Sequence, residues 1–474
     1  MTSHASLVSG SAGLRPAAAL TPEARLDSPS RLRNSLLRPG GPRSGVWSGL
    51  LSGLRRSVAA VVVALFAAAL LGNSVVAAEH AKPAAKAGQS VDAHAGHNHG
   101  KLGPAGEPTE LKKFGYAYLT AYMFCLSLCL GALFIVILNH LFDAQWMVPI
   151  RRFLEHIACQ LFPTMFILWL PIGFLAKYIY PWWEIDPHLD HALHAKAILF
   201  NPTAFWVVSC VLFLVWGFIA HGLRRASLAQ DKDGAASHTR TMRRYAAGGI
   251  FLFAFSLTGA AIYWMKSLQH QFFSTMYGVV YFAGSVWLTA ITTYWLLLYF
   301  KNRGDLKDVA REVTFHDCGK LFFAFTVFYA YIHFSQYFLI WNAAVPEETF
   351  WYVLREEGSW KWVGQLTIFG HFWFPFLFLL PIHRKLNFQV MSMMAGWAWL
   401  CHYMDLQFNI GPVLYPDGLH LGIYDLLSLG GMLAVLIFMF SRAFNAHPPY
   451  PQRDPRVAET FGVYVEPASS KAAH

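Results

Sequence analysis

Long apolar runs alternate with short polar segments over most of this 474-residue chain. Ten such runs occur, at 57–78, 114–141, 158–180, 201–223, 245–268, 275–300, 321–344, 362–381, 387–407 and 421–441. Each is long enough to cross a hydrocarbon core of about 30 Å as an α-helix. A helix satisfies its own backbone hydrogen bonds, which an irregular chain in lipid does not. The pattern therefore predicts an all-α, polytopic membrane protein with about ten transmembrane helices.

The polar segments between the apolar runs divide the chain into five regions. They are a disordered basic cytoplasmic tail (1–54), a first transmembrane helix (55–78), a His-rich periplasmic loop (79–113), a membrane domain (114–442) and a second cytoplasmic tail (443–474). The first helix has a second interpretation. Two arginines precede its apolar run and small residues end it, so it also fits a signal peptide that is cleaved after Ala78.

Composition and charge support the membrane assignment. The chain is 55% hydrophobic and only 14% charged, whereas soluble domains are about 25% charged. With the N-terminus in the cytoplasm, 27 of the 37 Lys and Arg residues lie in inner segments and 8 in outer ones. Basic residues favour the cytoplasmic side of a membrane. The net charge of +10 is therefore explained without a nucleic-acid partner.

The sequence contains no motif for a redox centre or a structural metal. None of the six cysteines forms a C-x-x-C pair, so neither an Fe–S cluster nor c-type haem attachment is predicted. In the first outer loop, His94, His97 and His99 are weak candidates for Zn²⁺ or Cu²⁺ ligands. We interpret this stretch instead as a flexible, low-complexity loop.

Ionisable groups inside membrane spans are the main candidates for function, since each costs about 2.5–3.5 kcal/mol at the bilayer centre. His333 and His371 lie near the middle of consecutive antiparallel spans. Three roles compete: a proton relay, hydrogen-bonded core residues, or two axial ligands of a b-type haem. Gln336 shares the helix face of His333 with Tyr329 and Tyr337, and this polar stripe suits bound water or a quinone carbonyl.

A second group lies in the outer third of the last two spans. His402 and Asp405 are three residues apart and share a helix face. Asp425, preceded by Tyr424, begins the last span. Two carboxylates and an imidazole at one depth fit the outer end of a proton path or a site that deprotonates quinol. The alternative is a buried ion pair with Lys266 or a helix-capping role.

Short motifs in a fixed order link these residues to a known family. The motifs are His140, Arg151-Arg152, Glu155, Tyr180-Pro181-Trp182, Ser267-Leu268, Phe273–Gly278, His316–Leu321, Phe334–Tyr337, Pro346–Thr349, Gly370-His371-Phe372, Pro375-Phe376, His402, Asp405 and Pro412. From about 115 to 442 the set resembles the F-type membrane subunit of alternative complex III, in the NrfD/polysulfide-reductase-C-like family.

The resemblance implies a fold of two four-helix bundles plus flanking helices in the bacterial inner membrane. It implies a quinol:cytochrome c (or other acceptor) oxidoreductase in which this subunit has no redox centre. The implied partners are a sister NrfD-like subunit, a periplasmic Fe–S subunit, multihaem cytochrome c subunits and, in some complexes, a terminal oxidase. Haem c and Fe–S clusters belong to those partners, and quinol, often menaquinol, is the substrate. His371 and Asp405 match motif positions and become candidates for quinone contact or proton transfer.

One position departs from the family pattern. The family commonly has Asp-Trp before the Ser-Leu pair, but this chain has Tyr263 before Trp264, followed by Lys266. The loss of that carboxylate puts a proton path through this helix in doubt. Three other functions remain open: a secondary transporter, a haem-b membrane anchor using His333 and His371, and a purely structural anchor.

Overall fold

The computed structural model describes residues 108–461, and every regular element in this range is a helix. Seven long helices run through it: α3 (Glu110–Leu141), α8 (Pro202–Asp233), α9 (Ala236–Trp264), α10 (Tyr277–Arg303), α11 (Glu312–Ala343), α16 (Phe388–Ile410) and α17 (Ile423–Asn445). Two further spans are composite. One joins η1 (Gln145–Met147), α4 (Val148–Ala158), η2 (Cys159–Leu161) and α5 (Thr164–Phe174), and the other joins α13 (Trp360–Gln365), η5 (Leu366–Trp373) and α14 (Phe374–Leu379).

Eight of these described spans are long and apolar enough to cross a membrane. The prediction of an all-helical, multi-pass membrane protein is therefore confirmed. The predicted count of about ten is not. The run at 387–407 does form a helix, α16, but α16 is too polar to be counted. The run at 57–78, as helix or signal peptide, lies outside the described residues.

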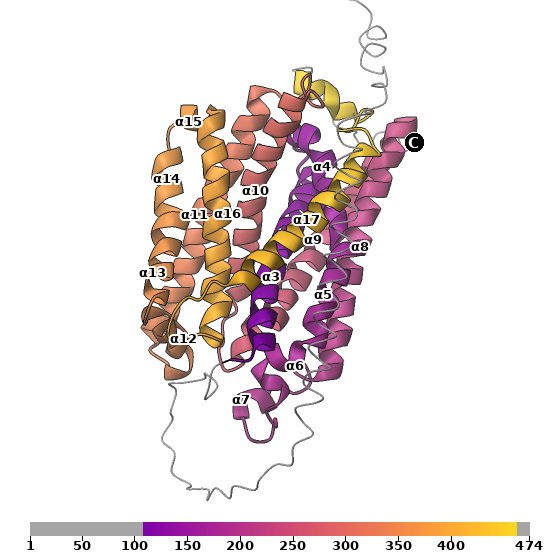
Figure 1. The fold of residues 1–474 in the computed structure, drawn as a ribbon. Coiled ribbons are helices and arrows are strands. Elements are labelled where there is room, and N and C mark those ends of the chain that lie inside the picture. The colour runs from indigo at the N-terminus through magenta and orange to yellow at the C-terminus, as the bar shows by residue number, and fades with distance from the viewer. Residues whose placement is uncertain (1–107, 462–474) are drawn as a thin grey trace, which may run out of the picture. The chain divides into compact units, whose positions relative to one another are not determined.

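Helix α3 lies at the centre of the fold. Its most apolar stretch is 89% buried, and it packs against α4, α9, α10, α16 and α17. In Figure 1, α4, α5 and α8 lie on one side of α3, and α11, α13, α14 and α16 lie on the other. A single helix thus connects two groups of spans. We call α4, α5 and α8 the first group, and α11, α13, α14 and α16 the second group.

The spans pair into hairpins whose ends are set by local sequence. Asn201 caps α8 by accepting a hydrogen bond from the Ala204 amide at 2.8 Å, and Pro202 occupies the first turn, where its missing N–H costs nothing. Gly234 ends α8 with φ +72°, and Gly304 ends α10 with φ +95°. Such left-handed conformations cost glycine least, so both hairpins turn sharply at these points.

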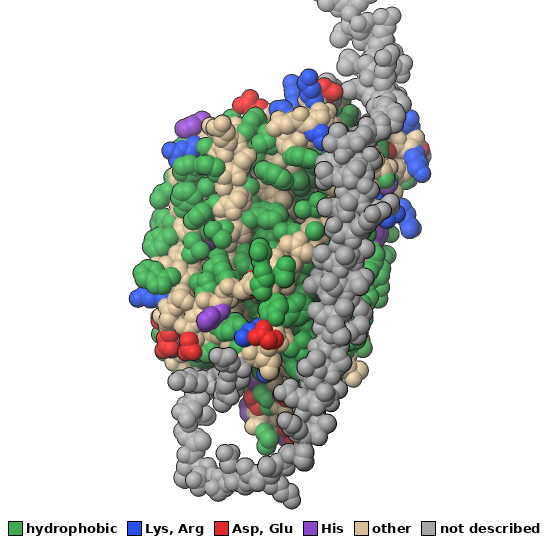
Figure 2. Space-filling view, in the orientation of Figure 1, with side chains coloured by type: hydrophobic (Ala, Val, Ile, Leu, Met, Phe, Trp, Pro, Cys, Tyr) green, Lys and Arg blue, Asp and Glu red, His purple; other side chains and the backbone are tan. Residues whose placement is uncertain are grey.

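Short helices cover the two ends of the spans. The end predicted to be periplasmic carries α6 (Ala176–Ile179), η3 (Pro181–Trp183), α7 (His191–His194), η4 (Lys266–Gln269), α12 (Pro346–Glu356) and η6 (Gly411–Val413). α15 (Ile382–Leu386) and η7 (Pro455–Phe461) lie at the opposite end. We use 'outer end' for the first of these two ends and 'inner end' for the second, after the orientation that the sequence predicts. Figure 2 shows hydrophobic side chains over the middle of the visible face, with charged side chains gathered toward the two ends.

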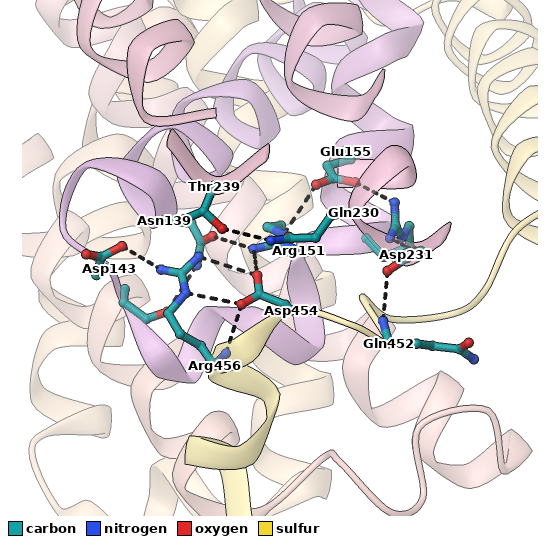
Figure 3. A network of polar contacts seen from close by, with 12 residues as sticks. Asn139, Asp143, Arg151, Glu155, Gln230, Asp231, Thr239, Gln452, Asp454 and Arg456 are labelled. Atoms are coloured by element: carbon teal, nitrogen blue, oxygen red, sulfur yellow. Dashed lines mark hydrogen bonds and ion pairs between the residues drawn. The ribbon is translucent and has the colours of Figure 1, made fainter. Parts of the chain in front are cut away.

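The segment 446–461, which we call the C-terminal strap, packs against the inner ends of the first group of spans. Arg151 of α4 donates a hydrogen bond to Asp454 of the strap at 2.6 Å, and both side chains are fully buried. Arg456 reaches Asp143 at 2.8 Å. Figure 3 shows how Glu155, which pairs with Arg151 at 3.3 Å, extends this network. Opposite charges therefore compensate one another inside the fold.

Candidate functional site

His371 lies at the centre of the second group of spans. Its side chain is completely buried, and its ring stacks between Trp287 of α10 (centroids 3.7 Å apart) and Tyr329 of α11 (3.8 Å). Neither ring nitrogen has a hydrogen-bond partner among the described residues. A buried polar group without a hydrogen bond is costly. The His371 ring is therefore held in place by stacking between Trp287 and Tyr329 and not by hydrogen bonds.

The backbone around His371 is π-helical over Leu366–Trp373. Such insertions into a helix occur frequently at functional sites. Gly370 allows this segment to approach α16, since a Cβ there would lie 2.8 Å from Leu366 and 3.1 Å from Trp397. The Trp397 indole donates a hydrogen bond to the Gly370 carbonyl at 2.8 Å. The π-helix thus fixes both the depth and the orientation of His371.

From His371, polar side chains continue toward the outer end. The Tyr329 hydroxyl lies beside the Asp405 carboxyl of α16, in a contact that falls short of full hydrogen-bond geometry. Asp405 is buried and forms no ion pair among residues 108–461. Asn409 donates to the Asp405 carbonyl at 2.7 Å and more weakly to its carboxylate at 3.4 Å. A carboxyl held in this way between helices needs a functional explanation.

Arg355 of α12 closes this series at its outer end. The buried guanidinium donates hydrogen bonds to the carbonyls of Phe408 (2.8 Å) and Asn409 (2.9 Å) and stacks 3.5 Å above the Trp351 ring. Burial lowers the pKa of Arg355 to about 9. We call His371, Tyr329, Asp405, Asn409 and Arg355 the polar column. Arg355 belongs to none of the motifs or spans singled out from the sequence, although the amphipathic pattern of Pro346–Glu356 indicates a helix with one buried side.

His402 joins the polar column from the side of α3. Its Nε2 lies 3.0 Å from the Ser127 hydroxyl. A Cβ at Gly284 would lie 2.9 Å from the His402 ring and 3.7 Å from Tyr329. This glycine therefore leaves the room in which the two rings meet, and the structure brings His402 and Asp405 into one cluster.

His333 and Gln336 occupy the edge of the cluster. The half-buried His333 ring lies 5.5 Å from Tyr329. Gln336 points toward α12, where it donates to the Tyr352 hydroxyl at 3.0 Å and accepts from Ser274 at 2.7 Å. A haem ligated by His333 and His371 would need the space that the Tyr329 ring fills, because this ring contacts both imidazoles. The residues present therefore do not fit a bis-histidine haem.

Asp425 and Tyr424 lie apart from the polar column, contrary to the expectation that both carboxylates share one site. Asp425 accepts hydrogen bonds from Tyr403 (2.9 Å), Gln407 (2.7 Å) and the Gly422 amide (2.9 Å). The last of these is the helix-capping role considered above. Tyr424 donates to Glu110 at 3.1 Å. Residues 405 and 407 lie about 200° apart around α16, so the helix presents Asp405 and the Asp425 contact to different sides.

Lys266 pairs with neither carboxylate in the described part of the chain. Its ammonium lies near the Phe273 ring, and burial together with Lys196 lowers its pKa to about 8. Burial therefore penalises the protonated lysine relative to the unfolded chain, and this cost is fully present below pH 8, where Lys266 is protonated in both states.

A Lys266→Met variant is expected to be more stable than the parent at pH 7, by about 1–2 kcal/mol after allowance for partial exposure. The advantage should shrink as the pH rises from 8 toward 10.5, because the folded parent then carries a neutral lysine at no cost. Melting curves of both proteins at pH 7 and pH 10 measure this. A constant difference at both pH values would contradict the account.

No protein-family model matches the chain, and no curated protein sequence matches it. Within residues 108–461, no group of three or more His, Cys, Asp or Glu side chains is placed to hold a metal ion. His94, His97 and His99 lie outside the described residues.

Proposed function

We propose that this chain is a membrane subunit of a quinol-oxidising complex of the alternative complex III type, in the bacterial inner membrane with its N-terminus in the cytoplasm. Electrons then travel through haem c and Fe–S clusters of partner subunits, and a sister NrfD-like subunit lies beside this one in the membrane. The motif resemblance supports this proposal, and so does the multi-pass helical fold.

The polar column is the observation that carries the proposal. It runs from His371, at mid-depth, past Asp405 to Arg355 at the outer end. Titratable side chains at this depth are costly and mark ion or proton pathways. The aromatic faces of Trp287 and Tyr329 on either side of His371 would offset part of the cost of protonating this buried ring. The Tyr329 ring stacks on His371 and its hydroxyl lies beside the Asp405 carboxyl, so these three side chains are the ones that we propose for proton transfer toward the outer end.

A secondary transporter is the second candidate, and one observation favours it. The span from Gln145 to Phe174 is interrupted around Pro163, and discontinuous helices often form transporter sites. The interruption bears no titratable group of the polar column, so we prefer the respiratory proposal.

Affinity purification in mild detergent, followed by mass spectrometry and haem staining, tests the proposal. We expect an Fe–S subunit, a multihaem cytochrome and a second NrfD-like chain to accompany the tagged protein. Recovery of this chain alone would contradict the proposal and favour the transporter. A reduced-minus-oxidised spectrum of the isolated chain that shows b-type haem would instead overturn the argument from Tyr329.

A further inference from the structure

The hairpin of α8 and α9 carries exposed stripes of side chains whose chemistry changes toward the inner end. On α8, exposed apolar side chains recur at helical spacing up to Phe218, and Arg225 continues the stripe seven residues later. The apolar members before Phe218 are Val207, Val211 and Leu214. One face of α8 therefore suits hydrocarbon over most of its length and an anion at its inner end.

Helix α9 has a stripe of the same kind. Phe255 and Phe251 are 78% and 68% exposed, and Arg244 lies seven residues before Phe251 on the same face. Arg240 is exposed one turn further toward the inner end. Both helices thus place an exposed arginine about two turns inward of an exposed phenylalanine.

The arginines of the two helices lie at one depth. Gln230 of α8 donates a hydrogen bond to the Thr239 hydroxyl of α9 at 2.7 Å, which fixes the register of the hairpin. Arg225 lies five residues before Gln230, and Arg244 lies five residues after Thr239. Because the helices are antiparallel, both arginines are about 7–8 Å from this pair along the hairpin. The same count places the two phenylalanines at a second shared depth.

Tyr245 connects the two stripes. Its ring contacts the ring of Phe218, with centroids 5.4 Å apart, and Gly222 lets it approach α8, since a Cβ there would lie 2.4 Å from the Tyr245 ring. Gly222 is three residues before Arg225, and Tyr245 directly follows Arg244. The arginines therefore border one seam between the helices, beside a tyrosine of the kind that is enriched at membrane–water interfaces.

The arginines of this seam have no carboxylate partner within residues 108–461. The two carboxylates of the hairpin are engaged elsewhere: Asp231 pairs with Arg152 of α4, and Asp233 with His238 at 2.9 Å. Figure 2 shows Lys and Arg side chains gathered along the inner half of the edge that α8 forms. A guanidinium is a planar fork that suits phosphate oxygens, so the seam is prepared for an anion that the described chain does not supply.

We propose that Arg225, Arg240 and Arg244 bind the phosphate of an anionic phospholipid in the inner leaflet, whose acyl chains lie along the apolar stripes of α8 and α9. Seven residues of helix span about 10 Å, which carries the arginines from the aromatic level into the headgroup layer. Basic groups just cytoplasmic of a membrane helix attract anionic lipids. An acidic protein or a nucleic acid would use the arginines but would leave the adjoining apolar stripes uncovered. The inference does not depend on the proposed role in quinol oxidation.

Native mass spectrometry of the purified full-length protein, with any subunits that it retains, tests the site by titration with phosphatidylglycerol. We expect phosphatidylglycerol to bind about tenfold more tightly than phosphatidylcholine, which carries the same phosphate but no net charge. Arg225→Gln and Arg244→Gln should each weaken phosphatidylglycerol binding about fivefold. Arg442→Gln, which removes an exposed cation at the inner end of α17, is the matched control and should bind as the parent does. Melting without added lipid should be unchanged in all three variants, because the replaced side chains are exposed.

Equal binding of the two lipids, or arginine variants that bind like Arg442→Gln, would overturn the inference. Displacement of the lipid by inorganic phosphate at physiological ionic strength would reveal a site for a free anion and would also overturn it. So would an acidic protein that is lost from the sample in Arg225→Gln and Arg244→Gln while lipid binding stays at the level of the parent.

Discussion

Replacing Asp454 with alanine is expected to lower the free energy of unfolding by about 3 kcal/mol at neutral pH. The substitution leaves Arg151 buried with only Glu155 to compensate its charge, and breaking a buried ion pair from one side costs about 3–5 kcal/mol. Truncation after Asn445, which removes the whole C-terminal strap, should be at least as damaging. Thermal unfolding in detergent measures both effects.

The effect of Asp454 should depend on pH in one direction. Burial alone would raise the pKa of Asp454, but Arg151 and Arg456 hold it well below its usual range. A carboxyl with a lowered pKa stabilises the fold above its ordinary pKa of about 3.9, and this contribution is lost as the pH falls below that value. The difference between parent and Asp454→Ala should therefore be constant from pH 8 to 5 and shrink below about pH 4. Asp417→Ala, at an exposed loop position, is the control, and equal melting of all three proteins would contradict the account.

Arg355→Ala is expected to have the second large effect, a loss of about 3–5 kcal/mol. The guanidinium binds three backbone carbonyls and the Gln269 side chain at 3.2 Å. Its removal leaves buried acceptors at the end of α16 without a donor. Arg355→Lys keeps the charge but not the planar fork, so it should recover only part of the loss.

Hydrogen exchange locates the effect of Arg355. Amides of residues 405–414 should exchange faster in Arg355→Ala than in the parent, since the C-terminal end of α16 loses its anchor. Lys361→Ala, at an exposed lysine at the same outer end, should leave both stability and exchange unchanged. An Arg355→Ala protein with parental exchange at these residues would show that α12 does not hold α16.

The helical architecture was predictable because lipid imposes a length and an apolar composition on each span. Helix α16 was predicted from the apolar run at 387–407, even though its polar residues make it less apolar than the other spans. His333 and His371 were expected to share a depth in consecutive spans, and the Tyr329 ring lies next to both imidazoles. The separation of Asp405 from Asp425 was not expected, because depth alone says nothing about which side of α16 each residue faces.

Other features of the structure depend on contacts between segments that lie far apart in the sequence, and a single sequence does not predict such contacts. The π-helix at His371 depends on how Gly370 and Trp397 pack across two helices, and no local sequence pattern predicts it. The burial of Arg355 depends on α12 folding back onto the end of α16. The C-terminal strap pairs Asp454 with Arg151, 303 residues away, a separation over which periodicity carries no information.

The most direct test of the central claim is turnover and proton release by the assembled complex carrying Asp405→Asn or His371→Phe. Both variants should retain the subunits of the complex, while quinol-dependent turnover in proteoliposomes falls about 10- to 100-fold and proton release falls with it. Asp417→Asn, at an exposed loop position, is the control and should show the same quinol-dependent turnover and proton release as the parent. Parental turnover and proton release in both variants, with assembly verified, would contradict a working role for the polar column and leave this chain as a structural anchor.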